Sequence, residues 1–236
     1  MSKQIRKIGK MNEWAWVLGV LLCSLGVALC TKAGFGLSMI AAPAYMLHIK
    51  LRTVSSFFTQ GACEYFWQGF LLILMCLGIQ RFRFRYLFAF VTAILSGLAI
   101  DGWLFLLGGN GVPASLVLRI LFFVFGELFT TLAVALYFRT TWPLQIYELL
   151  VAEISDRYTL PIGRVKLVND VMMLVISVAL ALGLNRSLDG IGIGTVIITL
   201  VNAFLIGMFG RLLDRFFSFE TRTPRLTAWL MGQSKS

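Results

Sequence analysis

Hydrophobic residues are gathered into six long blocks that alternate with short polar segments. Each block is about 20 residues long, which is enough for a helix to cross the roughly 30 Å hydrocarbon core of a bilayer. The blocks cover residues 13–32, 55–79, 86–108, 114–138, 165–184 and 191–213. The pattern predicts an all-α polytopic membrane protein with six transmembrane helices in a single membrane domain, residues 1–236.

Basic residues lie almost entirely between these blocks, and their distribution predicts the orientation. If the N-terminus is cytoplasmic, sixteen of the 21 Lys and Arg residues fall in cytoplasmic segments, against four in outer segments. Such an excess of positive charge usually marks the inner side. The sequence therefore predicts a multi-pass protein with cytoplasmic N- and C-termini. The tail, residues 214–236, mixes aromatic and basic residues and is expected to lie along the inner membrane surface.

Two apolar segments are too short to span the membrane. Residues 38–49 are predicted on the outer side and residues 142–154 on the inner side. Each follows a break in the pattern, and the hydroxyls of Ser38 and Thr141 are expected to cap the first helical turns. Each segment could be an amphipathic helix on the membrane surface or a re-entrant half-helix that enters the membrane.

The order of these features repeats along the chain. The first unit contains an Ala-Leu-x-x-basic motif at residues 28–32, then a break, a short helix and a span that ends in Leu-Gly. The same series recurs about 105 residues later, from residue 135. Because each unit holds three spans, the second unit inserts with the opposite orientation. The sequence therefore predicts a 3+3 inverted-topology repeat, an architecture found in many secondary transporters. The two units cover residues 13–108 and 114–213.

Composition and charge narrow the class of protein. The 236 residues are 58% hydrophobic and 14% charged, with a mean hydropathy of +0.84, whereas soluble domains carry about 25% charged residues. These values exclude a soluble enzyme, a disordered protein and a disulfide scaffold. The net charge of +10 would suggest nucleic acid on a soluble protein. Here it follows from topology signals, so the expected partner is the lipid bilayer and not nucleic acid.

Acidic residues within the predicted spans are the main candidates for chemistry. Each would cost roughly 2.5–3.5 kcal/mol at the bilayer centre, so these side chains should face the interior, a wet cavity or an interface. The acids are Glu64, Asp101, Glu127 and Asp170. Polar residues at helical spacing also predict polar stripes along two spans. The stripes contain Gln60, Glu64 and Gln68, and Thr195, Thr199 and Asn202.

We predict a central site between the two repeat units. Glu64 and Asp170 occupy nearly corresponding positions in the two units, and we expect them to bind the substrate or a proton. Further candidates for this site are Gln60, Gln68, Asn169, Glu127, Asp101 and Asn202.

Simpler roles are open for three of the acids. Glu127 could pair with Arg119, and Asp170 could pair with Lys166, which precedes it by four residues. Asp101 lies near the outer end of its span and could be solvated.

Other kinds of site are not expected. The four cysteines lie inside apolar blocks without the paired spacing of a zinc site. His48 is the only histidine, which is too few for a metal cluster or a catalytic triad. Because no G-x-S-x-G or other nucleophile motif occurs, the chain is expected to be neither an enzyme nor dependent on a metal or cofactor.

Several local motifs resemble YczE/YitT-type bacterial integral membrane proteins. They are residues 26–29, the glycine break at Gly34 and Gly36, the short helix with Pro43, the close of a span at Leu77-Gly78, and residues 142–145. The resemblance covers roughly residues 13–215 and implies a bacterial plasma-membrane protein of presumed transport function. Members often carry Pro-Trp-Asp after the break. This chain has Ser38-Met39-Ile40 there, so no acidic site residue is transferred to that position.

These features favour a small secondary transporter or facilitator of a small polar metabolite, amine-bearing or zwitterionic. The protein could act as a homodimer or with a partner subunit. Two alternatives stay open. One is a substrate-binding membrane subunit of an energy-coupling transporter, which would need a partner ATPase, and the other is a non-transporting membrane scaffold or regulator.

Overall fold

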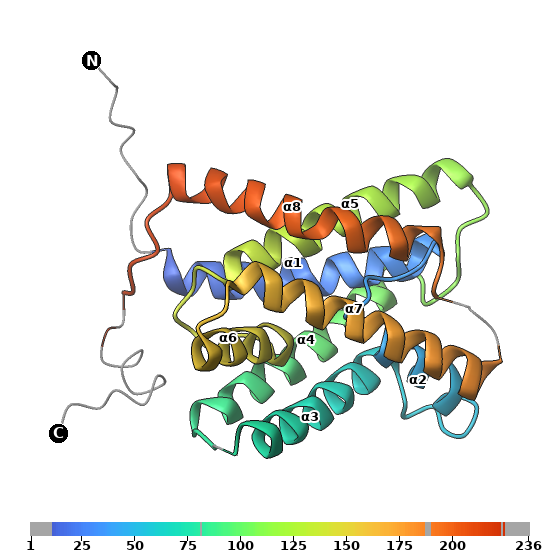
Figure 1. The fold of residues 1–236 in the computed structure, drawn as a ribbon. Helices are drawn as coiled ribbons and strands as arrows, with labels where there is room; N and C mark the ends of the chain where they lie inside the picture. The colour runs from blue at the N-terminus through green and yellow to red at the C-terminus, as the bar shows by residue number, and fades with distance from the viewer. Residues whose placement is uncertain (1–10, 81, 187–189, 223, 225–236) are drawn as a thin grey trace.

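The computed structural model describes residues 11–80, 82–186, 190–222 and 224, and the regular structure of these residues is helical (Figure 1). The predicted all-α class is thus confirmed for the described part of the chain. The α-helices are α1 (Asn12–Ala33), α2 (Ala42–Leu51), α3 (Gln60–Ile79), α4 (Arg85–Leu106), α5 (Leu116–Tyr137), α6 (Ile146–Tyr158), α7 (Ile162–Leu180) and α8 (Ile193–Phe216). A π-helical turn, η1 (Ala181–Asn185), continues α7.

Among the described residues, five helical segments are long and apolar enough to cross a membrane. They are α1, α3, α4, α5 and the continuous helix that α7 forms with η1, residues 162–184. This finding indicates a multi-pass membrane protein. α8 has 24 residues, and its role as a sixth span stays a prediction.

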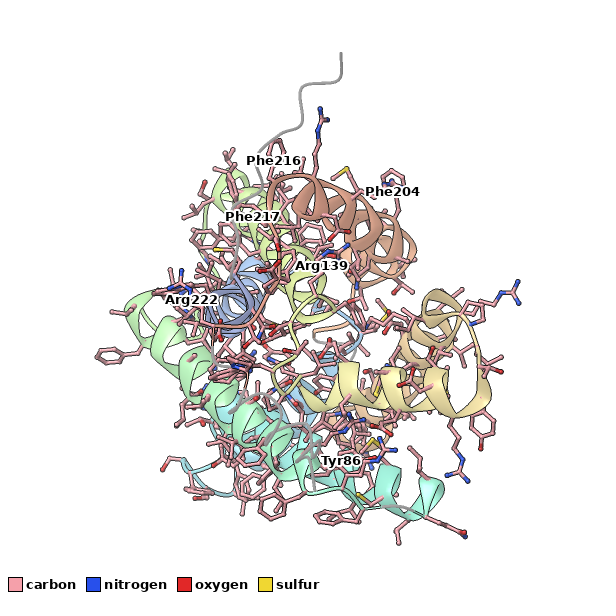
Figure 2. All side chains as sticks on the ribbon, turned by 90° about the vertical axis from the view of Figure 1, so that its left-hand side faces the viewer. Tyr86, Arg139, Phe204, Phe216, Phe217 and Arg222 are labelled. Atoms are coloured by element: carbon pink, nitrogen blue, oxygen red, sulfur yellow. The ribbon has the colours of Figure 1, made fainter. Side chains whose placement is uncertain are left out.

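The distribution of polar side chains is inverted relative to a soluble protein. The outer faces of the helices expose large apolar side chains, such as Phe105 (84% exposed) and Phe204 (65% exposed), and Figure 2 shows Phe204 at the periphery. The interior instead holds charged and amide side chains, among them Lys166, Glu64 and Gln68. A lipid environment accounts for both features, because apolar surface is stable there and charges are not.

α1 and α5 pack against each other more extensively than any other described pair of helices. A Cβ atom on Gly26 would lie 2.6 Å from the backbone oxygen of Gly126, and one on Gly126 would lie 2.7 Å from Cys30 Sγ. The missing side chains therefore let the two backbones approach, as in small-residue contacts between membrane helices. This contact joins the two halves of the chain.

The two short helices lie at opposite ends of the bundle, α6 at the left and α2 at the right of Figure 1. The segment before α2 enters the interior, where Met39 and Ile40 belong to the same core cluster as Trp67, Met173 and Ile198. The start of α2 is therefore deeply buried, although the helix is only 10 residues long.

The caps of the short helices differ from the prediction. The N-cap residues are Ala41 and Gln145, so the prediction that Ser38 and Thr141 occupy these positions is wrong. Thr141 is instead bonded to Asn12, whose Oδ1 accepts from the Thr141 backbone N–H (2.7 Å) and hydroxyl (3.1 Å). A proline in this segment also disfavours a helical conformation for the residue before it, which delays the start of α6.

The predicted span over residues 55–79 begins too early. α3 starts at Gln60, because the Thr59 hydroxyl caps it by accepting a bond from the Ala62 backbone N–H at 3.0 Å. Residues 55–58 are apolar in part, but they form the turn before the helix.

The ends of three helices are joined at the end of the molecule where α6 lies. Arg139, just after α5, donates two hydrogen bonds to Asp214 of α8 at 2.7 and 2.6 Å. Beyond α8 the chain extends beside α1, where the Met11 N–H donates to Ser218 O at 3.2 Å. Figure 2 looks onto this end, with Arg139 near the ends of these helices and Tyr86 apart from them at the start of α4. Most of the predicted tail, residues 225–236, lies outside the described residues, as do the basic residues of the N-terminus before residue 11.

Candidate functional site

The first turn of α6 meets the middle of α3 inside the bundle. The Ile146 backbone N–H donates to Gln68 Oε1 at 3.2 Å, and the Tyr147 hydroxyl donates to Glu64 Oε1 at 2.9 Å. Gln68 Nε2 also donates to Glu64 Oε1, at 3.2 Å. The other end of α6 reaches the end of α3, where Arg157 donates to the backbone oxygen of Ile79. α6 therefore runs beside the second half of α3.

The extended segment before α6 is fixed by side chains from three other helices. Pro143 O accepts hydrogen bonds from Trp16 Nε1 (2.9 Å) and from the Thr92 hydroxyl (3.1 Å). Gln145 Nε2 bonds Ser96 Oγ at 2.6 Å and Tyr137 Oη at 3.1 Å. These contacts from α1, α4 and α5 determine where α6 begins.

A group of acidic side chains surrounds one lysine next to this first turn. Lys166 and Asp170 of α7 form an ion pair of 2.8 Å. Glu148 of α6 and Glu127 of α5 each lie within electrostatic range of both members of this pair, and Glu64 lies within range of Glu148. We call these five residues the central acid cluster. Their exposed fractions are between 2% and 8%.

The central acid cluster holds four carboxyl groups and one ammonium group. If every group were ionised, three negative charges would stay unbalanced, and burying an ion in a low-dielectric interior costs several kcal/mol. Oε2 of Glu148 and Oε2 of Glu127 also have no hydrogen-bond partner among the described residues. The arrangement is therefore suited to take up protons or a small cation.

The structure brings three of the four predicted acids together. Glu64, Glu127 and Asp170 belong to the cluster, and the two residues predicted to flank a central site are linked electrostatically through Glu148. The alternative pair of Asp170 with Lys166 is confirmed. Gln68 and Asn169 are also buried. Gln68 bonds Glu64, and Asn169 directly precedes Asp170 in α7.

The alternative pair of Glu127 with Arg119 is wrong. Arg119 Nε donates to the backbone oxygen of Ala33 at 2.8 Å, and its guanidinium carbon lies 4.6 Å from the ring centroid of Phe35. Arg119 therefore binds the carbonyl end of α1, where a positive charge is favourable.

The remaining predicted residues lie elsewhere. Asp101 is at the end of α4, where Oδ2 accepts from the Thr59 hydroxyl (2.6 Å) and Oδ1 accepts from the Gly61 N–H (2.8 Å). Gln60 is buried at the start of α3, and Asn202 is buried within α8. Asp101 thus stabilises the N-terminus of α3 outside the central acid cluster.

Comparison with known proteins places the chain in a family. Residues 11–211, most of the chain, match a family described as "Family of unknown function (DUF6198)". The chain belongs to this family. It is also 27% identical, over 215 residues, to "Uncharacterized protein YyaS" of Bacillus subtilis (strain 168), an alignment that covers 90% of this chain and 98% of that protein. No solved structure matches the chain significantly. The resemblance to YczE/YitT-type proteins stays a prediction.

Sequence reasoning missed three side chains in this DUF6198 chain. Tyr147 and Glu148 lie in residues 142–154, a segment too short to span the membrane, whereas the candidate acids all lie in predicted spans. Lys166 entered only as a partner of Asp170. The cost of burying a carboxylate, applied to residues 142–154 as a re-entrant helix, would have identified Glu148.

The described part of this DUF6198 chain contains no group of three or more His, Cys, Asp and Glu side chains that could hold a metal ion. The cysteines Cys23, Cys30, Cys63 and Cys76 are all free.

Proposed function

We propose that the protein is a small secondary transporter or facilitator of a small polar metabolite that carries an amine, either alone or in a zwitterion. The observation that carries the proposal is the central acid cluster. It gathers four buried carboxyl groups, three of them within electrostatic range of one lysine, at the point where a short helix begins inside the bundle.

The order of the helices supports an inverted repeat of six spans and two re-entrant helices. α1, α2, α3 and α4 begin at residues 12, 42, 60 and 85, and α5, α6, α7 and α8 begin at residues 116, 146, 162 and 193. The offset is about 105 residues for each pair. We infer that α8 is the sixth span and that α2 and α6 enter the membrane from opposite sides with their N-termini at mid-depth.

Such an arrangement is suited to the binding of an ammonium group. In one state, protons on the carboxyl groups would neutralise the buried charge, and in the other an ammonium group would take the place of one of these protons. Tyr147 and Gln68 donate to the same oxygen of Glu64, so a cation that binds this carboxylate competes with a bond that ties α6 to α3. Exchange between proton and substrate would then be coupled to the contact between these two helices.

Flux measurements test the proposal directly. The detergent-purified chain is first screened by thermal unfolding against amines and zwitterions across pH, because a ligand that binds the folded state raises the Tm. The stabilising compound is then followed into proteoliposomes under a proton gradient. We expect Glu64→Gln and Glu148→Gln each to lower the uptake rate at least about tenfold, a loss worth roughly 1.4 kcal/mol.

Glu220→Gln is the matched control, because Glu220 is exposed and lies beyond α8. It should transport at the wild-type rate. Unchanged binding and flux in both cluster variants would overturn the proposal. Copurification with an ATPase that is required for uptake would instead favour a substrate-binding subunit.

A further inference from the structure

A polar cavity lies away from the central acid cluster, where the end of α2 meets the start of α3 and the end of α4. Its volume is about 380 Å³, which is ample for a small metabolite. The polar side chains that line it include those of His48, Arg52, Thr59, Gln60, Asp101 and Asn110. We call this cavity the outer vestibule, after the side on which the charge pattern places it.

Gln60 contributes a buried acceptor to the wall of the outer vestibule. Its Nε2 donates to Thr31 Oγ1 at 2.7 Å, while the Thr31 hydroxyl donates its proton to Val27 O at 2.9 Å. Thr31 Oγ1 can therefore only accept from Gln60, which fixes the orientation of the amide. Gln60 is 3% exposed, and its Oε1 has no hydrogen-bond partner among the described residues. A buried acceptor of this kind is costly unless a ligand donates to it.

Asp101 supplies a fixed carboxylate in the same cavity. Its two oxygens each accept one bond, from the Thr59 hydroxyl and from the Gly61 N–H. A carboxylate has about four acceptor positions, so further positions are left for a donor in the cavity. The bonds to the start of α3 hold the carboxylate in place before any ligand binds, which lowers the entropic cost of binding.

Arg52 provides the opposite charge at the mouth of the outer vestibule. It is exposed and follows the last turn of α2. Lys32, another basic side chain at this end, donates to Gly109 O at 2.9 Å. The contacts of His48 favour a neutral ring, because Nδ1 faces the backbone oxygen of Phe58 at 2.8 Å and Nε2 faces the Asn110 amide nitrogen at 3.1 Å. The cavity therefore combines one guanidinium with one carboxylate.

We propose that the outer vestibule is a loading site for a zwitterion, with the ammonium group on Asp101 and Gln60 Oε1 and the carboxylate on Arg52. Arginine and a carboxylate match in charge and in fork geometry. Gln60, Glu64 and Gln68 follow one another at intervals of four residues on one face of α3. Gln60 of the outer vestibule and Glu64 of the central acid cluster thus lie one helical turn apart on the same face of α3. The proposal deepens the proposed function by choosing zwitterions over simple amines.

Binding to the purified chain tests this site without requiring transport. Glycine, leucine, glutamine and γ-aminobutyrate serve as probes in thermal unfolding. Each is compared with the amine that lacks the carboxylate and the acid that lacks the amino group. We expect at least one zwitterion to raise the Tm, and neither of its singly charged analogues to do so at the same concentration. Failure of all four zwitterions, or equal stabilisation by an analogue, would overturn the proposal.

Variants then locate the site. Arg52→Gln should weaken binding of that zwitterion at least about tenfold, and Arg52→Lys should recover part of it. Lys50→Gln is the matched control, because Lys50 is exposed on the same helix and does not line the cavity. Glu64→Gln should lose flux but keep the part of the Tm rise that Arg52→Gln removes, which separates this site from the central one. If Glu64→Gln abolishes binding and Arg52→Gln leaves it unchanged, the vestibule proposal is wrong while the proposed function stands.

Discussion

At the scale of single residues, the surroundings of His48 disfavour protonation of its ring. Burial lowers the pKa of His48 below its ordinary value of 6.5, and the neighbouring Arg52 adds to this effect, while the hydrogen bond to Phe58 O and the charge of Asp101 oppose it. The neutral ring also matches its partners, since Nδ1–H can donate to Phe58 O and Nε2 can accept from Asn110. A protonated ring would place two donors, Nε2–H and the Asn110 amide, against each other.

We therefore expect acid to destabilise the folded protein through His48. The unfolded chain binds the proton more readily than the folded chain, so stability is full above pH 6.5 and falls as the pH drops below this value. Thermal unfolding between about pH 7.5 and pH 5.5 should show a lower Tm at acid pH, by roughly 2–4 °C for each kcal/mol lost. His48→Gln should reduce this loss. A parallel decline in both proteins would assign the effect to other groups.

Individual residues also show how far a sequence can lead. The spacing of Lys166 and Asp170 was enough to anticipate their ion pair, because residues four apart on a helix are neighbours. The bonds from Tyr147 to Glu64 and from Ile146 to Gln68 join residues about 80 positions apart. Helical spacing carries no information about such contacts, which depend on where α6 enters the bundle.

At the scale of helices, the most extensive contact between described helices is that of α1 with α5, and it includes a close approach of the two backbones. Gly26 and Gly126 face each other there, and a side chain on either would meet backbone or Cys30. Gly78 of α3, in contrast, has nothing within 4 Å of its Cβ position. Gly26 and Gly78 therefore differ in what surrounds them, although both lie in long apolar helices.

This difference predicts opposite effects of substitution. Gly26→Val should separate α1 from α5 and destabilise the protein by about 1–3 kcal/mol, the usual range for overpacking. Gly78→Ala should be neutral or stabilising by up to about 1 kcal/mol, since alanine favours a helix. Thermal unfolding of the two variants in detergent measures both effects. Equal stability of the two variants would contradict the close contact.

The helices themselves were largely predictable, and their ends less so. Long apolar blocks define the long helices because length and hydropathy suffice for a span. The start of α3 and the caps of α2 and α6 were misplaced. Apolar residues such as Phe57 occur in the turn before Thr59, and a hydropathy pattern does not distinguish them from residues of the helix.

At the scale of the whole molecule, the proposed topology fixes the sides on which two exposed turns lie. Val54, after α2, is 76% exposed, and Leu160, after α6, is 46% exposed. Along the chain, Val54 and Leu160 are separated by three long helices, α3, α4 and α5, and by the short helix α6. If α6 enters and leaves on one side, Val54 and Leu160 lie on opposite sides of the membrane. If α6 crosses completely, they lie on the same side.

Cysteine labelling distinguishes these arrangements. Val54→Cys and Leu160→Cys are made in a chain whose four native cysteines are replaced by alanine, and the cysteine-free chain is the control. We expect a membrane-impermeant maleimide to label Val54→Cys in intact cells and Leu160→Cys only in inverted vesicles. Labelling of both variants from one side would rule out a re-entrant α6, and a reversed pattern would rule out cytoplasmic termini.

The contact between α1 and α5 also constrains the order of biosynthesis. α5 begins at residue 116 and α1 at residue 12, so at about 5–20 residues per second the ribosome completes α5 several seconds or more after α1 has been made. During this interval the face of α1 that contains Gly26 has no helix to pack against. Asn12 Oδ1 also lacks the hydrogen bonds that it later accepts from Thr140 and Thr141. We expect the nascent first half to depend on an insertase or a membrane chaperone, and a stalled chain to be the form that quality-control proteases degrade.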